Sequence, residues 1–263
     1  MDTGLHHFAE VTLLITHYNR SASLARLLRA FRELNCSFGG IVVSDDASKP
    51  EHLKEIKSLA TQYHFELIST PQNKGLGNNI NKGQAAVKTP YTLYVQEDFV
   101  PKAAFVPHFK DALAFMQDDV SWDIVRFYAY FPYPYLRPFA KGFSKMIFKP
   151  QLWYTNHLKF YFYSDHPHLR RSSFLEKFGP YAEGIKSDKT EFLMCLSFLK
   201  KNGKGLFFDD FTTLFDQKNT NDEPSTINRS DWRESQNPLF LLLRWGYLKL
   251  RLVKNTFELA FFK

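Results

Sequence analysis

Cysteine is scarce in this sequence, which has only Cys36 and Cys195 among its 263 residues. The two are not spaced like the ligands of a metal site, which come in close pairs. Reduced, buried thiols suit a chain of this kind, and such thiols are typical of cytoplasmic proteins.

Long apolar runs are also missing. No stretch approaches the roughly 18–20 apolar residues that a membrane-spanning helix needs. The first 20 residues have no basic region followed by an apolar core, so they resemble neither a signal peptide nor an anchor. We therefore expect a cytoplasmic protein.

Two glycine patterns are absent as well. No G-x-G-x-x-G follows the first apolar run, and G-x-x-x-x-G-K-[S/T] occurs nowhere in the chain. These absences argue against a nicotinamide enzyme and a P-loop NTPase. The net charge of +7 favours an anionic partner, such as a phosphorylated substrate, nucleic acid or an anionic membrane surface, although solubility alone would also account for it.

In the first hundred residues, segments with the apolar pattern of a strand alternate with segments with the apolar pattern of a helix. The pattern predicts strands over 11–18, 40–46, 64–70 and 91–96, with helices over 23–34, 50–63 and 77–88 between them. Such βαβ units form a parallel sheet with helices on both faces. Farther on, we expect a helix over 102–117, a strand over 122–131 and a helix over 189–203. The fold class is therefore α/β.

Polar residues gather where the predicted strands end, which is the edge at which open α/β sheets bind ligands. Each group alone has a structural explanation, such as a helix cap or a turn. Together they indicate one binding site. They are Thr16, Tyr18, Asn19 and Arg20 after the first strand, Asp45 and Asp46 after the second, Asn73, Gly75, Asn79 and Asn81 after the third, and Glu97 and Asp98 after the fourth.

Four segments in this order resemble the nucleotide-binding half of the family 2 glycosyltransferases, which have the GT-A fold. They are VTLLITHYNR, IVVSDDAS, NKGLGNNINKG and YVQEDF, and they cover roughly residues 10–101. The resemblance implies a nucleotide-diphospho-sugar donor, with a UDP-sugar favoured, and no nucleic-acid partner. It places Thr16, Tyr18 and Asp45 or Asp46 at the base and ribose, and Asn73, Asn79 and Asn81 near the base and diphosphate.

The acidic pair falls where the family carries an Asp-x-Asp motif that holds a divalent cation. Here the motif reads Gln96-Glu97-Asp98, so an amide replaces the first carboxylate. The resemblance makes Asp98 the ligand of Mn²⁺ or Mg²⁺, with Glu97 assisting at the metal or the donor sugar. Carboxylate oxygens are the ligands that these hard cations prefer. The alternative is an acidic turn that binds no metal.

A catalytic base is expected at the start of the 189–203 helix. Inverting transfer needs a carboxylate that deprotonates the acceptor hydroxyl. The family places it in a Glu-Asp motif, which appears here as Glu191-Phe192. Glu191 is therefore the first candidate and Asp188 the second, while helix capping would explain either residue.

The segment 163–171 contains Asp165, two histidines, Arg170 and Arg171. With no complementary ligands elsewhere, we expect a loop that lines the active site rather than a metal cluster. The two arginines could face phosphates, or they could lie in a solvated basic turn.

The chain is expected to form one GT-A domain over 1–215, with a nucleotide-sugar half (1–101) and an acceptor half (102–215). Residues 216–263 then form a polar linker and an amphipathic C-terminal helix. Residues 238–263 contain five basic residues and one acid, with leucines and phenylalanines on one side. The helix would bind an anionic membrane, as a peripheral protein does, or pack on the body or a partner subunit.

The expected function is transfer of a sugar from a nucleotide-diphospho-sugar to a saccharide or lipid-linked saccharide in cell-surface polysaccharide synthesis. The mechanism would be inverting and metal-dependent. Two alternatives are a non-catalytic binding protein on the same fold and a sugar nucleotidyltransferase. The latter usually has a glycine-rich basic loop after its first strand, which THYNRSAS lacks.

Overall fold

The first half of the chain alternates strands and helices, as its sequence pattern predicts. The computed structural model describes residues 4–151, 153–219, 223 and 237–262. Strands β1, β2, β3 and β4 pair in parallel. The elements of this half are β1 (His6–His17), α1 (Ser21–Glu33), β2 (Cys36–Asp45), α2 (Pro50–Tyr63), β3 (Glu66–Ser69), α3 (Gly75–Ala85) and β4 (Tyr91–Gln96).

The second half adds shorter strands, most of them antiparallel to their neighbours. The expected helix over 102–117 is α4, whereas the strand expected over 122–131 is only three residues long and is followed by a loop. The elements are β5 (Phe99–Pro101), α4 (Phe105–Asp118), β6 (Ile124–Arg126), β7 (Leu136–Ala140), β8 (Phe143–Met146), the 3-10 helix η1 (His157–Tyr161), β9 (His168–Arg171), α5 (Phe174–Phe178), α6 (Ser187–Lys200), β10 (Gly205–Phe208), β11 (Phe215–Gln217) and α7 (Pro238–Phe261).

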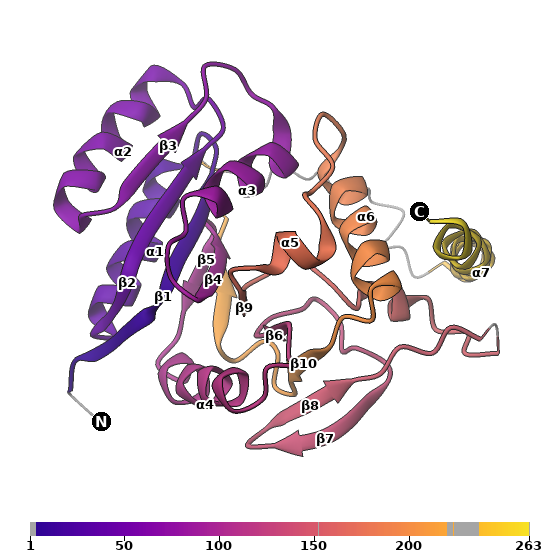
Figure 1. The fold of residues 1–263 in the computed structure, drawn as a ribbon. Helices are drawn as coiled ribbons and strands as arrows, with labels where there is room; N and C mark the ends of the chain where they lie inside the picture. The colour runs from indigo at the N-terminus through magenta and orange to yellow at the C-terminus, as the bar shows by residue number, and fades with distance from the viewer. Residues whose placement is uncertain (1–3, 152, 220–222, 224–236, 263) are drawn as a thin grey trace.

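The main sheet has the strand order β3-β2-β1-β4-β9-β6-β10-β8-β7. Figure 1 shows α1 and α2 beside the parallel strands and α6 on the opposite side of the molecule, next to α7. Because β1 to β4 are parallel, the turns that follow them lie at one edge. The α/β class is thus confirmed, with a parallel half in a mixed main sheet and a separate two-stranded sheet of β5 and β11.

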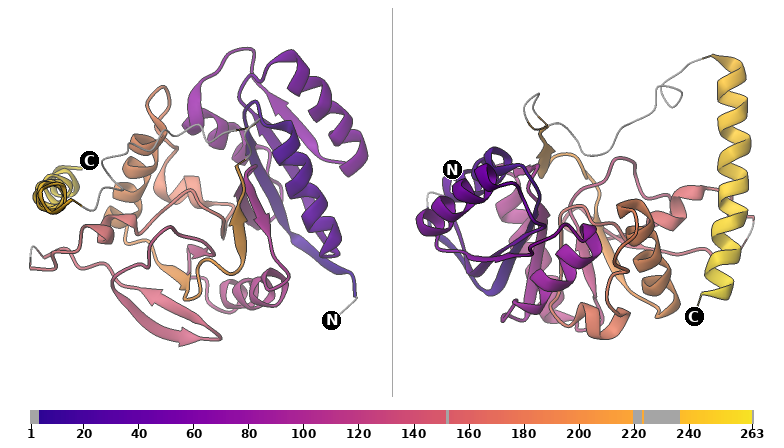
Figure 2. Two further views of the ribbon diagram at one scale, coloured as in Figure 1. Left: turned by 180° about the vertical axis from the view of Figure 1, so that it is seen from behind. Right: turned by 90° about the horizontal axis from the view of Figure 1, so that it is seen from above.

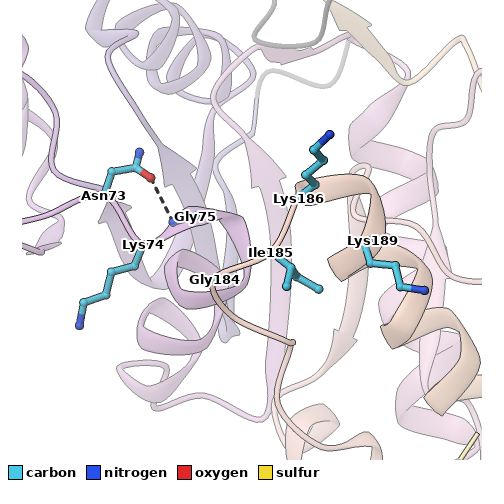
Figure 3. A pocket seen from close by; sticks show the side chains of 7 residues that line it. All are labelled: Asn73, Lys74, Gly75, Gly184, Ile185, Lys186 and Lys189. Carbon is cyan, nitrogen blue, oxygen red and sulfur yellow. Dashed lines mark hydrogen bonds between the residues drawn. The ribbon is translucent and has the colours of Figure 1, made fainter.

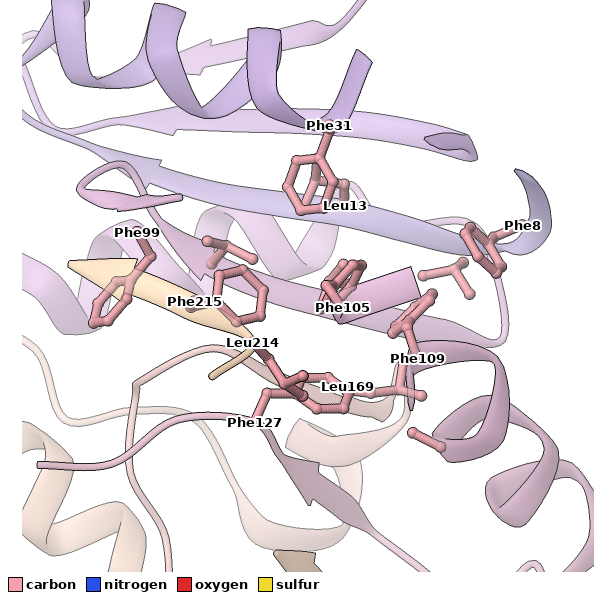
Figure 4. Packing of buried hydrophobic residues seen from close by; sticks show 14 of the residues in the cluster. Phe8, Leu13, Phe31, Phe99, Phe105, Phe109, Phe127, Leu169, Leu214 and Phe215 are labelled. Atoms are coloured by element: carbon pink, nitrogen blue, oxygen red, sulfur yellow. The ribbon is translucent and has the colours of Figure 1, made fainter. Parts of the chain in front are cut away.

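Aromatic side chains fill the space between α1, α4 and the sheet. Phe31 of α1, Phe105 and Phe109 of α4 and Phe215 of β11 belong to one buried cluster (Figure 4). Ring pairs pack edge to face, as between Phe105 and Phe215 at 5.1 Å. Burial of each such side chain contributes about 1.5–3 kcal/mol, so these phenylalanines stabilise the fold that positions the sheet edge.

The segment expected to be an active-site loop is partly a central strand. Residues 168–171 form β9, which lies between β4 and β6. Arg170 is fully buried and donates to Gln84 Oε1 at 2.7 Å. Arg171 donates to the carbonyl of Trp122 at 2.9 Å. Both guanidinium groups therefore bind acceptors inside the protein, and the expectation of phosphate-facing or solvated arginines is wrong.

The C-terminal region packs back on earlier parts of the chain. β11 pairs with β5, and α7 then packs on η1 and α6. Most of the predicted linker lies outside the described residues. Among the described residues, no helix is both long and apolar enough to cross a bilayer. Cys36 and Cys195 are free thiols, the second one buried.

Candidate functional site

The turn after β1 is held by a buried histidine and aspartate. His17 Nδ1 lies 2.9 Å from Asp45 Oδ1, and His17 Nε2 accepts the backbone N–H of Arg20. An accepting Nε2 means that Nδ1 carries the proton and donates it to Asp45. The side-chain hydroxyl of Ser69 and the backbone N–H of Ser48 also donate to Asp45. Burial opposes ionisation, yet these hydrogen bonds lower the pKa of Asp45 to about 2. Asp45, with no exposed surface, therefore fixes this turn.

Asp46 and the α3 asparagines also bind within the protein. The Asp46 carboxylate accepts the backbone N–H groups of Lys74 and Gly75 at 2.8 Å each, where α3 begins. Asn79 accepts from Ser44 Oγ and donates to the His17 carbonyl. Asn81 donates to the Tyr181 carbonyl and thereby ties α3 to the loop before α6. These residues build the walls of the site.

Three residues at the end of β1 and in the turn that follows it differ in exposure. Thr16 is buried, with its hydroxyl 3.0 Å from the Tyr94 hydroxyl. Asn19 has a positive φ and accepts the Lys49 N–H, so it shapes the turn. Tyr18 is 37% exposed and presents its ring at the sheet edge. Of these three, Tyr18 has the surface that a base could stack on.

The acidic pair after β4 has a positive partner in Arg20. Arg20 Nη1 lies 3.3 Å from Asp98 Oδ2 and 3.5 Å from Glu97 Oε1, and all three side chains are at most 12% exposed. Burial, followed by the charge of Asp98, raises the pKa of Glu97 to about 8 even though Arg20 opposes this shift. One guanidinium therefore does not offset two buried carboxylates at this position.

The acidic pair suits a divalent cation. Two carboxylates suffice for Mg²⁺ or Mn²⁺ when substrate phosphates and water complete the coordination. The raised pKa of Glu97 indicates that the pair can accommodate further positive charge. Among the described residues, no group of three or more His, Cys, Asp or Glu side chains converges as a complete metal site. The residues present thus fit a cation that arrives with a diphosphate.

A C-terminal arm, which we define as residues 215–219 and 223, closes over this cluster. Gln217 Nε2 donates to Asp98 Oδ2 at 2.8 Å, and Arg20 Nη2 donates to Asn219 Oδ1 at 2.6 Å. The Glu223 carboxylate accepts the backbone N–H groups of Ala22 and Ser23 at 2.9 and 2.8 Å. Since the α1 N-cap residue makes no side-chain cap of its own, Glu223 supplies the cap from about 200 residues away.

We expect Glu223→Gln to lower the free energy of unfolding by about 1 kcal/mol at neutral pH, the usual size of an N-cap contribution. Burial opposes ionisation of Glu223, but its hydrogen bonds with Ser23 and Ala22 lower its pKa overall. A lowered pKa means that the stabilisation is present above the ordinary glutamate pKa and is lost as pH falls through the folded-state pKa.

Thermal unfolding of Glu223→Gln and the parent at neutral and acidic pH measures this difference. Glu51→Gln, which changes an exposed acid in the first turn of α2, is the control. A difference that is equally large at acidic pH would contradict the capping role of the carboxylate.

A basic pocket of about 740 Å³ opens between α3 and α6 (Figure 3). It is lined by Asn73, Lys74, Gly75, Gly184, Ile185, Lys186 and Lys189. Three lysines and no acid line it, and the helices on either side both begin here. Lysines beside helix N-termini favour an anionic ligand.

Glu191 reaches from α6 to the loop before β9. Its Oε1 accepts the backbone N–H of Asp165 at 3.2 Å, and Gln96 Nε2 donates to Asp165 Oδ2 at 3.2 Å. Burial, then the charge of Glu191, raises the pKa of Asp165 well above its usual value. Both effects favour the protonated form of Asp165. Asp188 is instead exposed, and its Oδ1 accepts the backbone N–H of Lys189.

The structure brings Glu191 and Gln96 together through Asp165, and it connects Arg20, Glu97 and Asp98. Sequence reasoning missed Asp165 and Glu223 as members of these groups. Asp165 had one signal, its place in the acidic and histidine-rich stretch 165–168. Glu223 had none, because nothing local relates residue 223 to residue 22.

Comparisons with known proteins identify the same fold. The family model described as Glycosyl transferase family 2 matches residues 12–179. No curated protein sequence matches the chain.

Solved GT-A structures are similar at low sequence identity. S. aureus TarS 1–349 aligns with a TM-score of 0.55 and 18% identity, covering 78% of this chain and 59% of TarS 1–349. The structure of TarS 1–349 in complex with UDP-GlcNAc aligns with a TM-score of 0.58 and 15% identity, covering 96% of this chain and 73% of that one. The mannosyltransferase PcManGT from Pyrobaculum calidifontis, in complex with GDP-Man and Mn²⁺, aligns with a TM-score of 0.54 and 13% identity. The alignment covers 77% of this chain and 55% of PcManGT.

The family match spans more than half of the chain, and the sheet and its flanking helices agree with the GT-A neighbours. The resemblance carried by the four sequence segments is confirmed. The chain belongs to glycosyltransferase family 2.

Proposed function

We propose that this chain transfers a hexose from a nucleotide-diphospho-sugar, with a UDP-sugar favoured, to a saccharide acceptor, with inversion and with help from a divalent cation. The observation that carries the proposal is one sheet edge that combines a basic pocket, a buried acidic pair and a glutamate whose carboxylate is held by a backbone N–H. TarS and PcManGT, which share the fold, are described with UDP-GlcNAc and with GDP-Man and Mn²⁺.

The donor nucleotide would bind along the turns after β1 and β3. Tyr18 offers an exposed ring for the base, and Asn73 offers a side-chain amide at the rim of the pocket. Lys74, Lys186 and Lys189 supply positive charge for the diphosphate. Thr16, Asn19, Asp45, Asp46, Asn79 and Asn81 would act chiefly by holding these turns in place, with Gly75 giving the backbone N–H that Asp46 accepts.

Asp98, assisted by Glu97, would hold Mn²⁺ or Mg²⁺ together with the donor phosphates. The bound cation neutralises charge that develops on the leaving nucleotide. Arg20 and Gln217 orient the Asp98 carboxylate from two sides. This arrangement keeps the carboxylate oxygens fixed before any donor binds.

Glu191 would act as the general base that removes the acceptor hydroxyl proton. It is half-buried beside Asp165, whose raised pKa favours the protonated form, and buried Arg126 contributes a favourable charge interaction with Glu191. Asp188 is the weaker candidate because its carboxylate is exposed and accepts the backbone N–H of the next residue, Lys189. The Asp165 N–H fixes the direction of the Glu191 carboxylate.

We further propose that the acceptor is a saccharide or lipid-linked saccharide used in cell-surface polysaccharide synthesis, and that the enzyme works in the cytoplasm. The basic charge and the free cysteines are consistent with this setting.

The test is binding and hydrolysis of UDP-, GDP- and CMP-sugars with and without Mn²⁺. We expect at least one UDP-sugar to bind more tightly with Mn²⁺, and Asp98→Asn to lower that affinity at least tenfold, a typical cost of disturbing a metal site. Isothermal titration calorimetry measures the donor affinity of each variant. Asp216→Asn is the control, since Asp216 pairs with Lys102 at 2.7 Å and is 45% exposed.

Equal affinity of the parent and Asp98→Asn in Mn²⁺ would remove Asp98 from the site. Binding without turnover of any donor would favour the alternative of a non-catalytic sugar-nucleotide-binding protein. Absence of binding by every donor would contradict the proposal as a whole.

A further inference from the structure

Helix α7 packs on the body through a side that is both apolar and polar, since Leu252, Leu259 and Phe262 join a hydrophobic cluster with Phe160 and Leu196. Leu252 and Asn255 are 3% and 4% exposed. On the same side, Glu258 pairs with Lys189 of α6 at 3.2 Å, and Arg251 donates to the Tyr161 hydroxyl at 3.3 Å. Figure 2 shows the helix lying along one flank of the molecule. Apolar packing, an ion pair and a hydrogen bond therefore hold this side of α7 against the protein.

The opposite side of α7 is apolar and faces outward. Helical periodicity places its members on one stripe along most of the helix. Every member is more than 40% exposed, and Phe261 reaches 78%. We define the outward face as Leu242, Leu243, Leu250, Val253, Phe257 and Phe261.

An ordinary surface helix exposes a polar stripe. Helix α7 instead exposes a second apolar stripe, in addition to the apolar residues that it packs on the body. Several large apolar side chains in a continuous row mark an interaction site on a soluble protein. A contacting partner must accept both this stripe and the charges beside it.

Basic and aromatic residues border the outward face. Lys254 lies at one margin and is 66% exposed, while Lys249 lies at the other. Exposed Trp245 and Tyr247 occupy the same half of the helix as Leu242. Lysines attract anionic headgroups, and tryptophan and tyrosine favour the membrane–water interface. We propose that the outward face of α7 docks on the surface of an anionic lipid bilayer.

A second copy of the chain fits this face less well. Residues 238–263 contain five basic residues and one acid, so two such helices packed face to face would repel each other. An anionic bilayer is instead attracted by the same charges and accepts the apolar stripe.

Docking would also place the pocket near the lipid. Lys189 lines the basic pocket and pairs with Glu258 of α7. The ion pair of Lys189 thus connects the pocket to the docking helix. This connection suits a lipid-linked acceptor, a point that rests on the proposed function.

The experiment is flotation of the full chain with phosphatidylglycerol vesicles and with phosphatidylcholine vesicles. We expect the parent to float with the anionic vesicles and less so at high salt. The double variant Leu250→Asp/Phe257→Asp should bind at least tenfold more weakly. Val120→Asp is the matched control, because Val120 is an exposed valine outside α7. Circular dichroism of each variant checks that the fold is retained.

Equal flotation of the double variant and the control would overturn the proposal, as would equal binding to neutral and anionic vesicles. So would an absence of flotation combined with concentration-dependent self-association that the double variant abolishes, because the outward face would then be a contact between copies. Since flotation needs no donor or acceptor, its failure is distinguishable from a failure of the proposed transfer activity.

Discussion

Arg20→Ala is expected to lower the free energy of unfolding by about 3–5 kcal/mol, the cost of removing one partner of a buried ion pair. The substitution removes the positive charge beside Glu97 and Asp98 and the donors to Asn219 and the Glu223 carbonyl. A chain of this size should then melt about 10 °C lower. Differential scanning calorimetry measures the change.

The pH dependence of this loss follows from Glu97. Its raised pKa of about 8 means that the folded state binds this proton more tightly than the unfolded state, so the stability contributed by protonation is lost as pH rises from the ordinary glutamate pKa to about 8. Above that pH Glu97 is ionised beside Arg20, and removal of Arg20 should cost more than it does at lower pH.

Two variants control for general effects of losing an arginine at α1, which Arg20 precedes as the N-cap residue. Arg29→Ala changes an exposed residue of the same helix and should leave the melting temperature nearly unchanged. Arg20→Lys keeps the charge but not the two-pronged donor geometry, so it should fall between the parent and Arg20→Ala. A melting temperature of Arg20→Ala equal to that of Arg29→Ala would contradict the role of Arg20.

Glu191→Gln is expected to reduce turnover by about 10²–10⁴-fold while leaving donor affinity close to that of the parent. Positioned general bases contribute rate enhancements of this size. Glutamine keeps an oxygen that can accept the Asp165 N–H, so the local structure should persist. The measurement is kcat for sugar transfer beside Kd for the donor.

Asp188→Asn is the matched control and should retain most of the activity. Asp165→Asn keeps the backbone N–H that donates to Glu191, and we expect it to lower turnover less than Glu191→Gln does. If Asp188→Asn lost as much activity as Glu191→Gln, the assignment of the base to Glu191 would be wrong.

Local periodicity predicted the parallel half of the fold well. Most strands and helices up to β4 are long, with β3 the exception at four residues, and the helices have an apolar face at a clear period, as in Leu24, Leu27 and Leu28 of α1. The second half was harder because its strands have three to five residues. HLRR reads as a polar turn, yet it lies at the centre of the sheet because Gln84 and Tyr181 satisfy Arg170 from other elements.

The candidate site was likewise predictable only in part. Sequence motifs located the sheet edge, but they could not separate residues that touch a ligand from residues that hold the turns. Asp45 and Asn79 are buried and bonded within the protein, whereas Tyr18 is exposed. The Arg20 contacts with Glu97 and Asp98 depend on side chains 77 or more positions away, so no local pattern contains them.

The cap that Glu223 places on α1 also has a consequence for protein synthesis. Residues 20–23 emerge from the ribosome early, but their partners at 219 and 223 emerge some 200 residues later. During that interval the start of α1 and the guanidinium of Arg20 lack these acceptors. A nascent chain can therefore build the parallel strands, yet it completes the surroundings of the acidic pair only near the end of translation, so prematurely terminated chains should lack a finished donor site.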